Sequence, residues 1–302
     1  MNTEIINKTM DRSDLLTDEA KHVLQTIDSL IKTLYQKNLY MTSWHGTLPI
    51  DKIRLSKDGI KNFIKRMLGR TETRLTEDKS GVGIENRGVD YEPLPSSADD
   101  GRIPWYLYWE ILWVIKNGPE IKNNMRLLDA GGTSSLFSCY LASSGCEVHS
   151  IDLNETLASN GNKIAQTMGW NMHSHMMNMK QLNFPDEFFD HAYSICVFEH
   201  LDYDLKQASL VEIARCLKKN GILSLTFDYR NPAPGIAGYG KDTRSRNQLK
   251  TEKDIARSFL SSGHFELLGN QKFYDNGNSY LVHQKFDNTP YTFGAIFLKK
   301  KG

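Results

Sequence analysis

Arg126-Leu-Leu-Asp-Ala-Gly-Gly-Thr133 and Glu147-Val-His-Ser-Ile-Asp152 are the two stretches that decide the predicted fold. The leucines of the first stretch are typical of a buried strand, and its two glycines would let the backbone approach a ligand closely because they have no Cβ. We expect a helix over 134–143 and then a second strand, whose last residue, Asp152, comes 21 positions after Gly131. An acidic side chain at about that distance can accept hydrogen bonds from both ribose hydroxyls of a nucleoside. The pattern predicts a nucleoside site, although any doubly wound α/β protein can have a glycine after its first strand.

The loop Gly131-Gly132-Thr133-Ser134-Ser135-Leu136 separates two classes of cofactor. A dinucleotide fingerprint has the form G-x-G-x-x-G, and the later glycines of that form are missing here. We therefore do not expect a pyrophosphate cradle.

A second motif lies at 181–201, which reads QLNFPDEFFDHAYSICVFEHL. With this motif the chain resembles the class I S-adenosylmethionine-dependent methyltransferases, particularly the subgroup that acts on small molecules, lipids and glycans. The resemblance covers 126–232 well, 251–299 loosely and the first hundred residues not at all. It implies an α/β, Rossmann-like fold with a mostly parallel seven-stranded sheet and an antiparallel closing strand. It also implies S-adenosyl-L-methionine as the cofactor.

The resemblance assigns cofactor-binding residues by position. Gly131 and Gly132 would face the methionine moiety, although Thr133 and Ser135 stand where the family usually has glycines. Asp152 would hold the ribose. The full predicted set is Asp129, Gly131, Gly132, Asp152, Leu153 and Asn178-Met179 near the adenine, and Phe198 after the fourth strand.

The element Phe198-Glu199-His200 matches the family's segment beside the transferable methyl group. A hydroxyl acceptor needs a base, and a neutral histidine can take its proton. We therefore expect His200 to be the general base, with Glu199 or Asp228 as its partner; the alternative is a histidine that bonds backbone at a helix start. The Asp, Asp and Asn set of magnesium-dependent catechol methyltransferases cannot be found here, so the sequence predicts no metal.

Hydrophobic spacing predicts several further elements. A stripe of apolar residues indicates a helix over 17–36, and the spacing from Leu210 to Leu217 indicates another helix. Ile222–Asp228 is expected to be the fifth strand. Residues 265–268 and 291–299 are expected to form the closing antiparallel pair.

The first hundred residues contain a basic segment. Between Lys52 and Arg74 lie eight Lys/Arg and two acidic residues beside an apolar stripe. Lys61 and Arg66 are expected to bind a phosphate-bearing substrate, an acidic lipid surface or RNA, and a solvated helix face is the alternative. We divide the chain into an N-terminal helical extension or substrate cap over 1–103 and an S-adenosylmethionine-binding methyltransferase domain over 104–302.

Aromatic residues suggest two further contacts. Trp105, Trp109 and Trp113 recur every four residues, and this stripe is expected to pack a helix onto the sheet edge or a partner subunit. Tyr106, near the start of that helix, is expected to cover the cofactor or substrate pocket. Tyr229 begins a glycine-rich loop at the sheet edge where ligands bind in α/β folds, and it is expected to contact the substrate.

Composition limits the partners. With 37 Lys+Arg against 36 Asp+Glu, no nucleic-acid partner is expected. The four cysteines form no C-x-x-C pair, so we expect reduced, buried thiols, Cys196 included. No signal peptide or transmembrane segment is recognised, which predicts a cytoplasmic protein. Peripheral membrane contact and homo-oligomerisation are left open.

The leading hypothesis is O-methylation of a glycan or other small metabolite, which could be anionic. The alternatives are N- or C-methylation of a small molecule, and a cofactor-binding interaction protein without catalysis.

Overall fold

The computed structural model describes residues 5–15, 17–41, 83–86, 105–229, 249–276, 280–283 and 290–302. The basic segment that contains Lys61 and Arg66 lies outside them, as do the loop 230–248 and the side chains of Trp105 and Tyr106.

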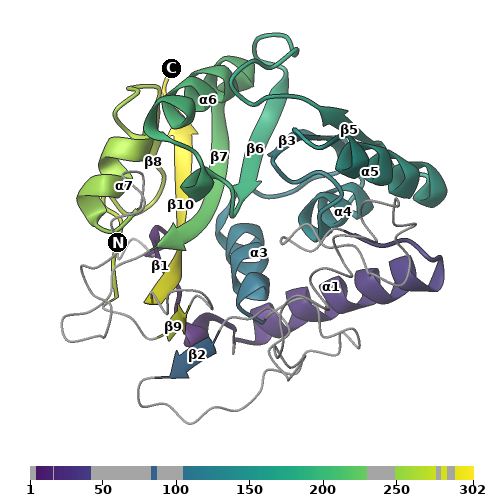
Figure 1. Ribbon diagram of the computed structural model, residues 1–302, viewed down its shortest axis with the longest axis horizontal. Helices are drawn as coiled ribbons and strands as arrows, with labels where there is room; N and C mark the ends of the chain where they lie inside the picture. The colour runs from purple at the N-terminus through teal and green to yellow at the C-terminus, as the bar shows by residue number, and fades with distance from the viewer. Residues whose placement is uncertain are drawn as a thin grey trace, which may run out of the picture.

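A twisted, mostly parallel sheet forms the centre of the molecule (Figure 1). Its strands run in the spatial order β5-β4-β3-β6-β7-β10, and β8 pairs with β10 beyond them. The bounds are β3 Arg126–Ala130, β4 Glu147–Asp152, β5 Met172–Met176, β6 Phe189–Ile195, β7 Leu217–Tyr229, β8 Phe265–Leu267 and β10 Pro290–Lys300. The pairs from β5 to β7 are parallel, whereas β10 is antiparallel to β7 and to β8. The predicted sheet with an antiparallel closing strand is confirmed.

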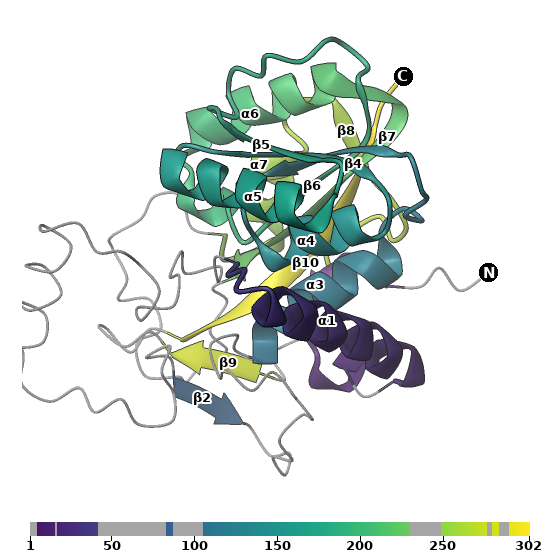
Figure 2. The ribbon, with the colours of Figure 1, turned by 90° about the vertical axis from the view of Figure 1, so that its right-hand side faces the viewer.

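Helices cover both faces of the sheet (Figure 2). Residues of α3 (Trp105–Asn117), α4 (Leu136–Ser143) and α5 (Glu155–Met168) pack into one hydrophobic core with α1 (Asp18–Gln36). Residues of α6 (Tyr203–Cys216) and α7 (Glu252–Phe259) pack into a second core. Short 3-10 turns, η1 (Arg12–Leu15) and η3 (Phe198–His200), complete this part of the chain. The arrangement has three layers, because an α/β sheet must bury its two apolar faces against helices.

The N-terminal residues join the same core. β1 (Lys8–Thr9) pairs with β10, and the predicted helix over 17–36 is α1, capped by Thr17. Trp109 and Trp113 are buried and stacked, with ring centroids 5.7 Å apart. Their indole N–H groups donate to Asp14 Oδ2 and to the Ile6 carbonyl. The tryptophan stripe therefore packs α3 onto the N-terminal segment, while the domain boundary at residue 103 stays a prediction.

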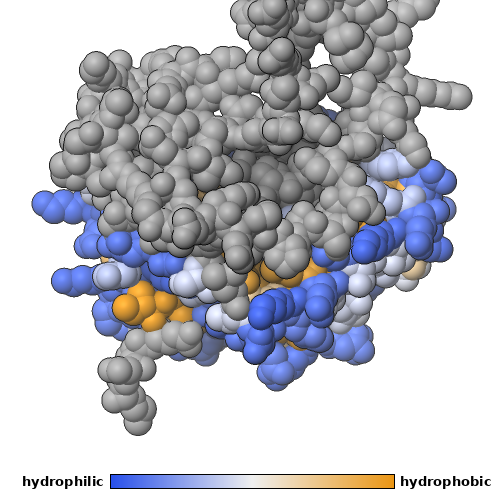
Figure 3. Space-filling model, turned by 90° about the horizontal axis from the view of Figure 1, so that it is seen from below, coloured by the Kyte–Doolittle hydropathy of each residue, from blue (hydrophilic) through white to orange (hydrophobic). Residues whose placement is uncertain are grey.

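The outer side of α1 is polar. Its buried residues, Ala20, Ile27, Leu30, Ile31 and Leu34, lie on one face, and the remaining positions are mostly charged or polar. Seen from below, the described surface is mainly hydrophilic, with small hydrophobic patches (Figure 3). This is the pattern expected of an amphipathic helix that packs on a hydrophobic core.

Two boundaries differ from the sequence-based expectation. The helix α6 ends at Cys216, and β7 begins at Leu217 rather than at Ile222. Leu217 pairs with Phe189 of β6, and the register shifts before the pair His191 and Ile222. Leu217 is buried in the second core as the first residue of β7, although the apolar spacing had assigned it to the helix.

A smaller extension lies beyond β10. There β2 (Gly83–Asn86) pairs with β9 (Tyr280–His283), which pairs with the start of β10. Among the described residues, no helix combines the length and the apolar character needed to cross a bilayer.

Candidate active site

The turn between β3 and α4 leaves no room for side chains at its two glycines. Gly131 has a φ of 88°, and a Cβ there would lie 2.6 Å from Cγ2 of Val197. A Cβ on Gly132 would lie 2.0 Å from Oδ2 of Asp129. The glycines therefore let the turn pack closely on the segment after β6 and on the end of β3.

Asp129, near the end of β3, stabilises this turn through hydrogen bonds. Its side chain is fully buried, and Oδ2 accepts a hydrogen bond of 2.6 Å from Ser138 Oγ and one of 3.3 Å from Ser135 Oγ. Burial raises the pKa of Asp129 to about 6, partly offset by these two hydroxyls. The contacts assign Asp129 a role in shaping the turn, and a direct cofactor contact stays a prediction.

Two serines stabilise the turn by hydrogen bonds. Ser134 adopts the left-handed conformation with a φ of 64°. Its Oγ accepts a hydrogen bond from Asn160 of α5, which also bonds to the Tyr40 carbonyl. Ser135, one of the two residues at expected glycine positions, caps α4, because its Oγ accepts from the Ser138 N–H at 3.0 Å.

Asp152 and its neighbours form an open surface at the ends of β4 and β5. Asp152 is partly exposed, and its Oδ1 accepts from the Asn154 N–H at 2.8 Å. Leu153 is 70% exposed, and Met176, at the end of β5, is 62% exposed. Large exposed apolar side chains beside a carboxylate are suited to a flat apolar ring that carries a sugar.

The other predicted cofactor residues lie in different environments. Asn178 is partly buried, and its Oδ1 accepts from the Lys180 N–H, whereas Met179 packs against the second core. Phe198 is fully buried, and its ring centroid lies 5.9 Å from that of Phe259. This placement gives Phe198 a packing role, so the prediction that it touches the cofactor has no support in the geometry.

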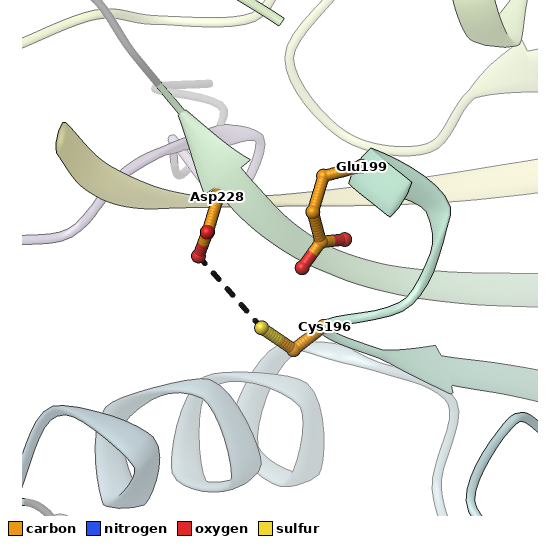
Figure 4. Close-up of side chains that lie close together, drawn as sticks. All are labelled: Cys196, Glu199 and Asp228. Carbon is orange, nitrogen blue, oxygen red and sulfur yellow. Dashed lines mark hydrogen bonds between the residues drawn. The ribbon is translucent and has the colours of Figure 1, made fainter. Parts of the chain in front are cut away.

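A cluster of ionisable side chains lies where β6 and β7 end. Cys196 follows β6, Glu199 belongs to η3 and Asp228 lies near the end of β7. One ligand atom from each lies within 4.8 Å of the others, and Cys196 Sγ is 3.8 Å from Asp228 Oδ1 (Figure 4). Cys196 has a φ of 56° and is only partly buried as a residue. Its side chain packs against the first hydrophobic core, as expected of a buried thiol, and it also lies beside two carboxylates.

Glu110 of α3 completes this cluster and was not predicted. It is fully buried, and neither carboxylate oxygen has a hydrogen-bond partner within the described part of the chain. Burial raises the pKa of Glu110 well above its usual value. Contacts with Thr226 and Cys196 lower this pKa by less, and the negative charges of Glu199 and Asp228 raise it further. The one signal in the sequence is a lone acid within the apolar run of α3.

Burial also governs Glu199. Its side chain is 6% exposed, and burial together with the Asp228 charge raises its pKa to about 8. His200 points outward with 70% of its side chain exposed, and its Nε2 lies 3.7 Å from Glu199 Oε1. The predicted trio of His200, Glu199 and Asp228 therefore comes from one end of the sheet, with the histidine on its outer side.

The predicted substrate contacts divide in two. Tyr229 is fully buried, and its hydroxyl donates to Asp275 at 3.2 Å while its ring packs near Phe273. This placement contradicts a substrate contact, because the side chain is used in the core. The side chains of Tyr106, Lys61 and Arg66 lie outside the described residues.

Comparison with known proteins bears on this site. Residues 128–225 match the family model of the methyltransferase domain. In structure, the chain is similar to the cyclase SpnF, with a TM-score of 0.50, 17% identity, and coverage of 67% of this chain and 84% of that one. No curated protein is detectably similar in sequence.

Two further solved structures show a lower similarity to this chain. Geranyl diphosphate C-methyltransferase from Streptomyces coelicolor A3(2) gives a TM-score of 0.49 at 13% identity, covering 70% of this chain and 83% of that one. A methyltransferase from Methanosarcina mazei gives 0.47 at 21% identity, covering 62% and 96%.

The match to the methyltransferase domain and the observed strand order of the sheet indicate the same fold. Residues 128–225 form a methyltransferase domain, and the strand order of the sheet is that of the class I methyltransferase fold. The protein is a methyltransferase, and S-adenosyl-L-methionine is its cofactor.

Proposed function

We propose that this protein transfers a methyl group to a hydroxyl of a small molecule or glycan. The observation that carries the proposal is the open surface of Asp152, Leu153 and Met176 beside the glycine turn. S-adenosylmethionine supplies an already activated methyl group. The protein then has to bind the donor, align an acceptor with it and exclude water, an effect that can be worth up to ~7–11 kcal/mol.

Each part of the surface suits a part of the donor. Asp152 would accept hydrogen bonds from the ribose hydroxyls, and Leu153 and Met176 would cover the adenine. Gly131 and Gly132, in the turn that follows β3, stay in the proposal as neighbours of the methionine end. Asn178 and Met179 stay in the proposal as neighbours of the adenine.

His200 is proposed to take the proton of the acceptor hydroxyl. Its exposed ring can reach a bound acceptor, and Glu199 lies close enough to orient it. Asp228 is the second candidate for that supporting role. Lys61 and Arg66 remain proposed contacts for an anionic group of the acceptor, and residues 1–103 remain the proposed substrate cap. A cytoplasmic location also stays a prediction.

The test of the donor site is calorimetry with S-adenosylhomocysteine. Replacing Asp152 by Ala removes a charged hydrogen-bond acceptor and should weaken binding roughly ten- to hundredfold, equal to about 1.5–3 kcal/mol. Asp204, in the first turn of α6, provides a matched surface control, and its Ala variant should bind like wild type. Equal binding by Asp152→Ala and wild type would reject this site.

Acceptor chemistry needs a separate experiment. Incubation with methyl-labelled donor and a metabolite extract, followed by mass spectrometry of the labelled products, identifies the acceptor atom. A labelled ether or ester supports O-methylation, whereas a labelled amine or carbon skeleton replaces it by the N- or C-methylation alternative.

A further inference from the structure

The acidic cluster at the ends of β6 and β7 has the composition of a metal site. It combines the thiol of Cys196 with the carboxylates of Glu199 and Asp228, and the three ligand atoms converge within 4.8 Å (Figure 4). They come from the turn after β6 and from the end of β7, which are adjacent parallel strands. The fold therefore holds the backbones of the three residues close together.

Glu110 provides an independent indication of a ligand. It reaches the cluster from α3, on another layer of the fold, and its side chain is completely buried. Neither of its oxygens has a hydrogen-bond partner among the described residues, whereas Oε1 of Glu199 lies 3.7 Å from Nε2 of His200. Buried acceptors are normally satisfied, and several carboxylates facing one another repel when they are charged. A cation among them would satisfy the open acceptors and remove the repulsion.

We propose that Cys196, Glu199 and Asp228 bind one divalent transition-metal ion, with Zn²⁺ as the best match and Glu110 facing the same ion. A thiolate is a soft ligand that zinc accepts together with carboxylate oxygen, whereas Mg²⁺ and Ca²⁺ prefer ligand sets made of oxygen alone. The sequence predicted no metal because the Asp, Asp and Asn set of catechol methyltransferases is missing, whereas this cluster consists of different ligands.

The observed spacing is close to what zinc requires. Bonds of about 2.3 Å to sulfur and 2.0–2.2 Å to oxygen put the two ligand atoms about 3.5 Å apart in a tetrahedral site. Cys196 Sγ and Asp228 Oδ1 are 3.8 Å apart. Binding must also displace the thiol proton, since the thiolate is the ligand. The proposed site thus predicts proton release on metal binding.

Cobalt(II) is the direct probe for this site. We would titrate Co²⁺ into untagged, chelator-treated full-length protein, because a cysteine thiolate bound to Co²⁺ gives a charge-transfer absorption band in the near ultraviolet. The expected result is a band that saturates at one Co²⁺ per chain and disappears when Zn²⁺ displaces it. Mg²⁺ should not displace it. Cys196→Ser should abolish the band, and Asp228→Asn should weaken binding at least tenfold.

Two controls separate ligation from folding. Cys146→Ser changes a buried thiol elsewhere, whose Sγ lies 3.3 Å from the Lys122 carbonyl, and it should keep the full band. Circular dichroism and S-adenosylhomocysteine binding report whether each variant is folded, and they test the donor site independently of the metal. If Cys196→Ser fails to fold, the wild-type stoichiometry and Asp228→Asn decide the question.

The proposal is overturned if wild type binds neither Co²⁺ nor Zn²⁺ stoichiometrically. It is also overturned if the band survives Cys196→Ser, or if folded Asp228→Asn binds as tightly as wild type. None of these results would affect the methyl-transfer proposal, which is judged by donor binding and labelled products.

Discussion

Gly131→Ala tests whether the glycine turn is built around its contact with Val197. An added Cβ would lie 2.6 Å from Cγ2 and 2.8 Å from Cγ1 of Val197, and the backbone has a φ of 88°. Val197 cannot easily move away, because a β-branched side chain has few χ1 rotamers. The substitution therefore combines backbone strain with overpacking.

Gly169 separates these two effects. It ends α5 with a φ of 69°, and an added Cβ would meet nothing within 4 Å. Gly169→Ala should therefore cost only the left-handed strain, about 1–2 kcal/mol of unfolding free energy. Gly131→Ala should cost that amount plus about 1–3 kcal/mol for overpacking, or about 2–5 kcal/mol in total.

The assay is urea denaturation followed by circular dichroism, with the slope of the transition checked for each variant. Combining Gly131→Ala with Val197→Ala should relieve the clash. Because Cβ of residue 197 would still lie 3.2 Å from the added Cβ, Gly131→Ala measured against Val197→Ala alone should cost less than in wild type but somewhat more than Gly169→Ala. If Gly131→Ala and Gly169→Ala cost the same in wild type, the close contact is not a constraint. If Val197→Ala gives no relief, the reasoning fails as well.

Three further substitutions test other parts of the structure. His200→Asn should lower kcat roughly 10²–10⁴-fold without changing S-adenosylhomocysteine affinity, and a loss of only a few-fold would indicate a structural histidine. Trp113→Phe removes the 2.8 Å bond to the Ile6 carbonyl and should cost about 1–3 kcal/mol by urea denaturation, with faster hydrogen exchange in β1; unchanged exchange would argue against this anchor. His149 has a pKa below its usual value, because burial outweighs its contact with Glu147, so protonation favours the unfolded chain. The stabilisation that requires neutral His149 is therefore fully present above about pH 6.5 and is lost as the pH falls below that value. The difference in unfolding free energy between wild type and His149→Gln should then narrow from about pH 7.5 to 5.5. A constant difference would contradict this reasoning.

The local sequence pattern was sufficient to predict the segment from β3 to the end of β4. A strand, a glycine turn, a helix and a second strand ending in an acid follow one another closely, so that spacing alone places Asp152 near Gly131. The position of Leu153 beside that acid follows from the sequence, whereas its assignment to the adenine came from the family resemblance and stays a prediction. Each of these relations spans one turn or one helix, a distance over which backbone geometry determines position.

The roles that depend on packing between distant elements could not be read from the chain. Phe198 and Tyr229 follow the correct strands, but contacts with Phe259, Phe273 and Asp275 turn them into the core. Glu110 is 86 positions before Cys196 in the sequence, and only the packing of α3 brings it to the ends of β6 and β7. Local sequence patterns do not predict contacts between residues that are so far apart in the chain.

The same edge of the sheet has two environments that suit different chemistry. At the ends of β4 and β5 the carboxylate of Asp152 is partly exposed beside apolar surface, whereas Glu199 near the end of β6 is almost completely buried. Gly131 joins them, because its Cα packs against Val197, which lies between Cys196 and Glu199 in the turn after β6. A donor held at Asp152 and extended over Gly131 would therefore direct its reactive end toward that turn.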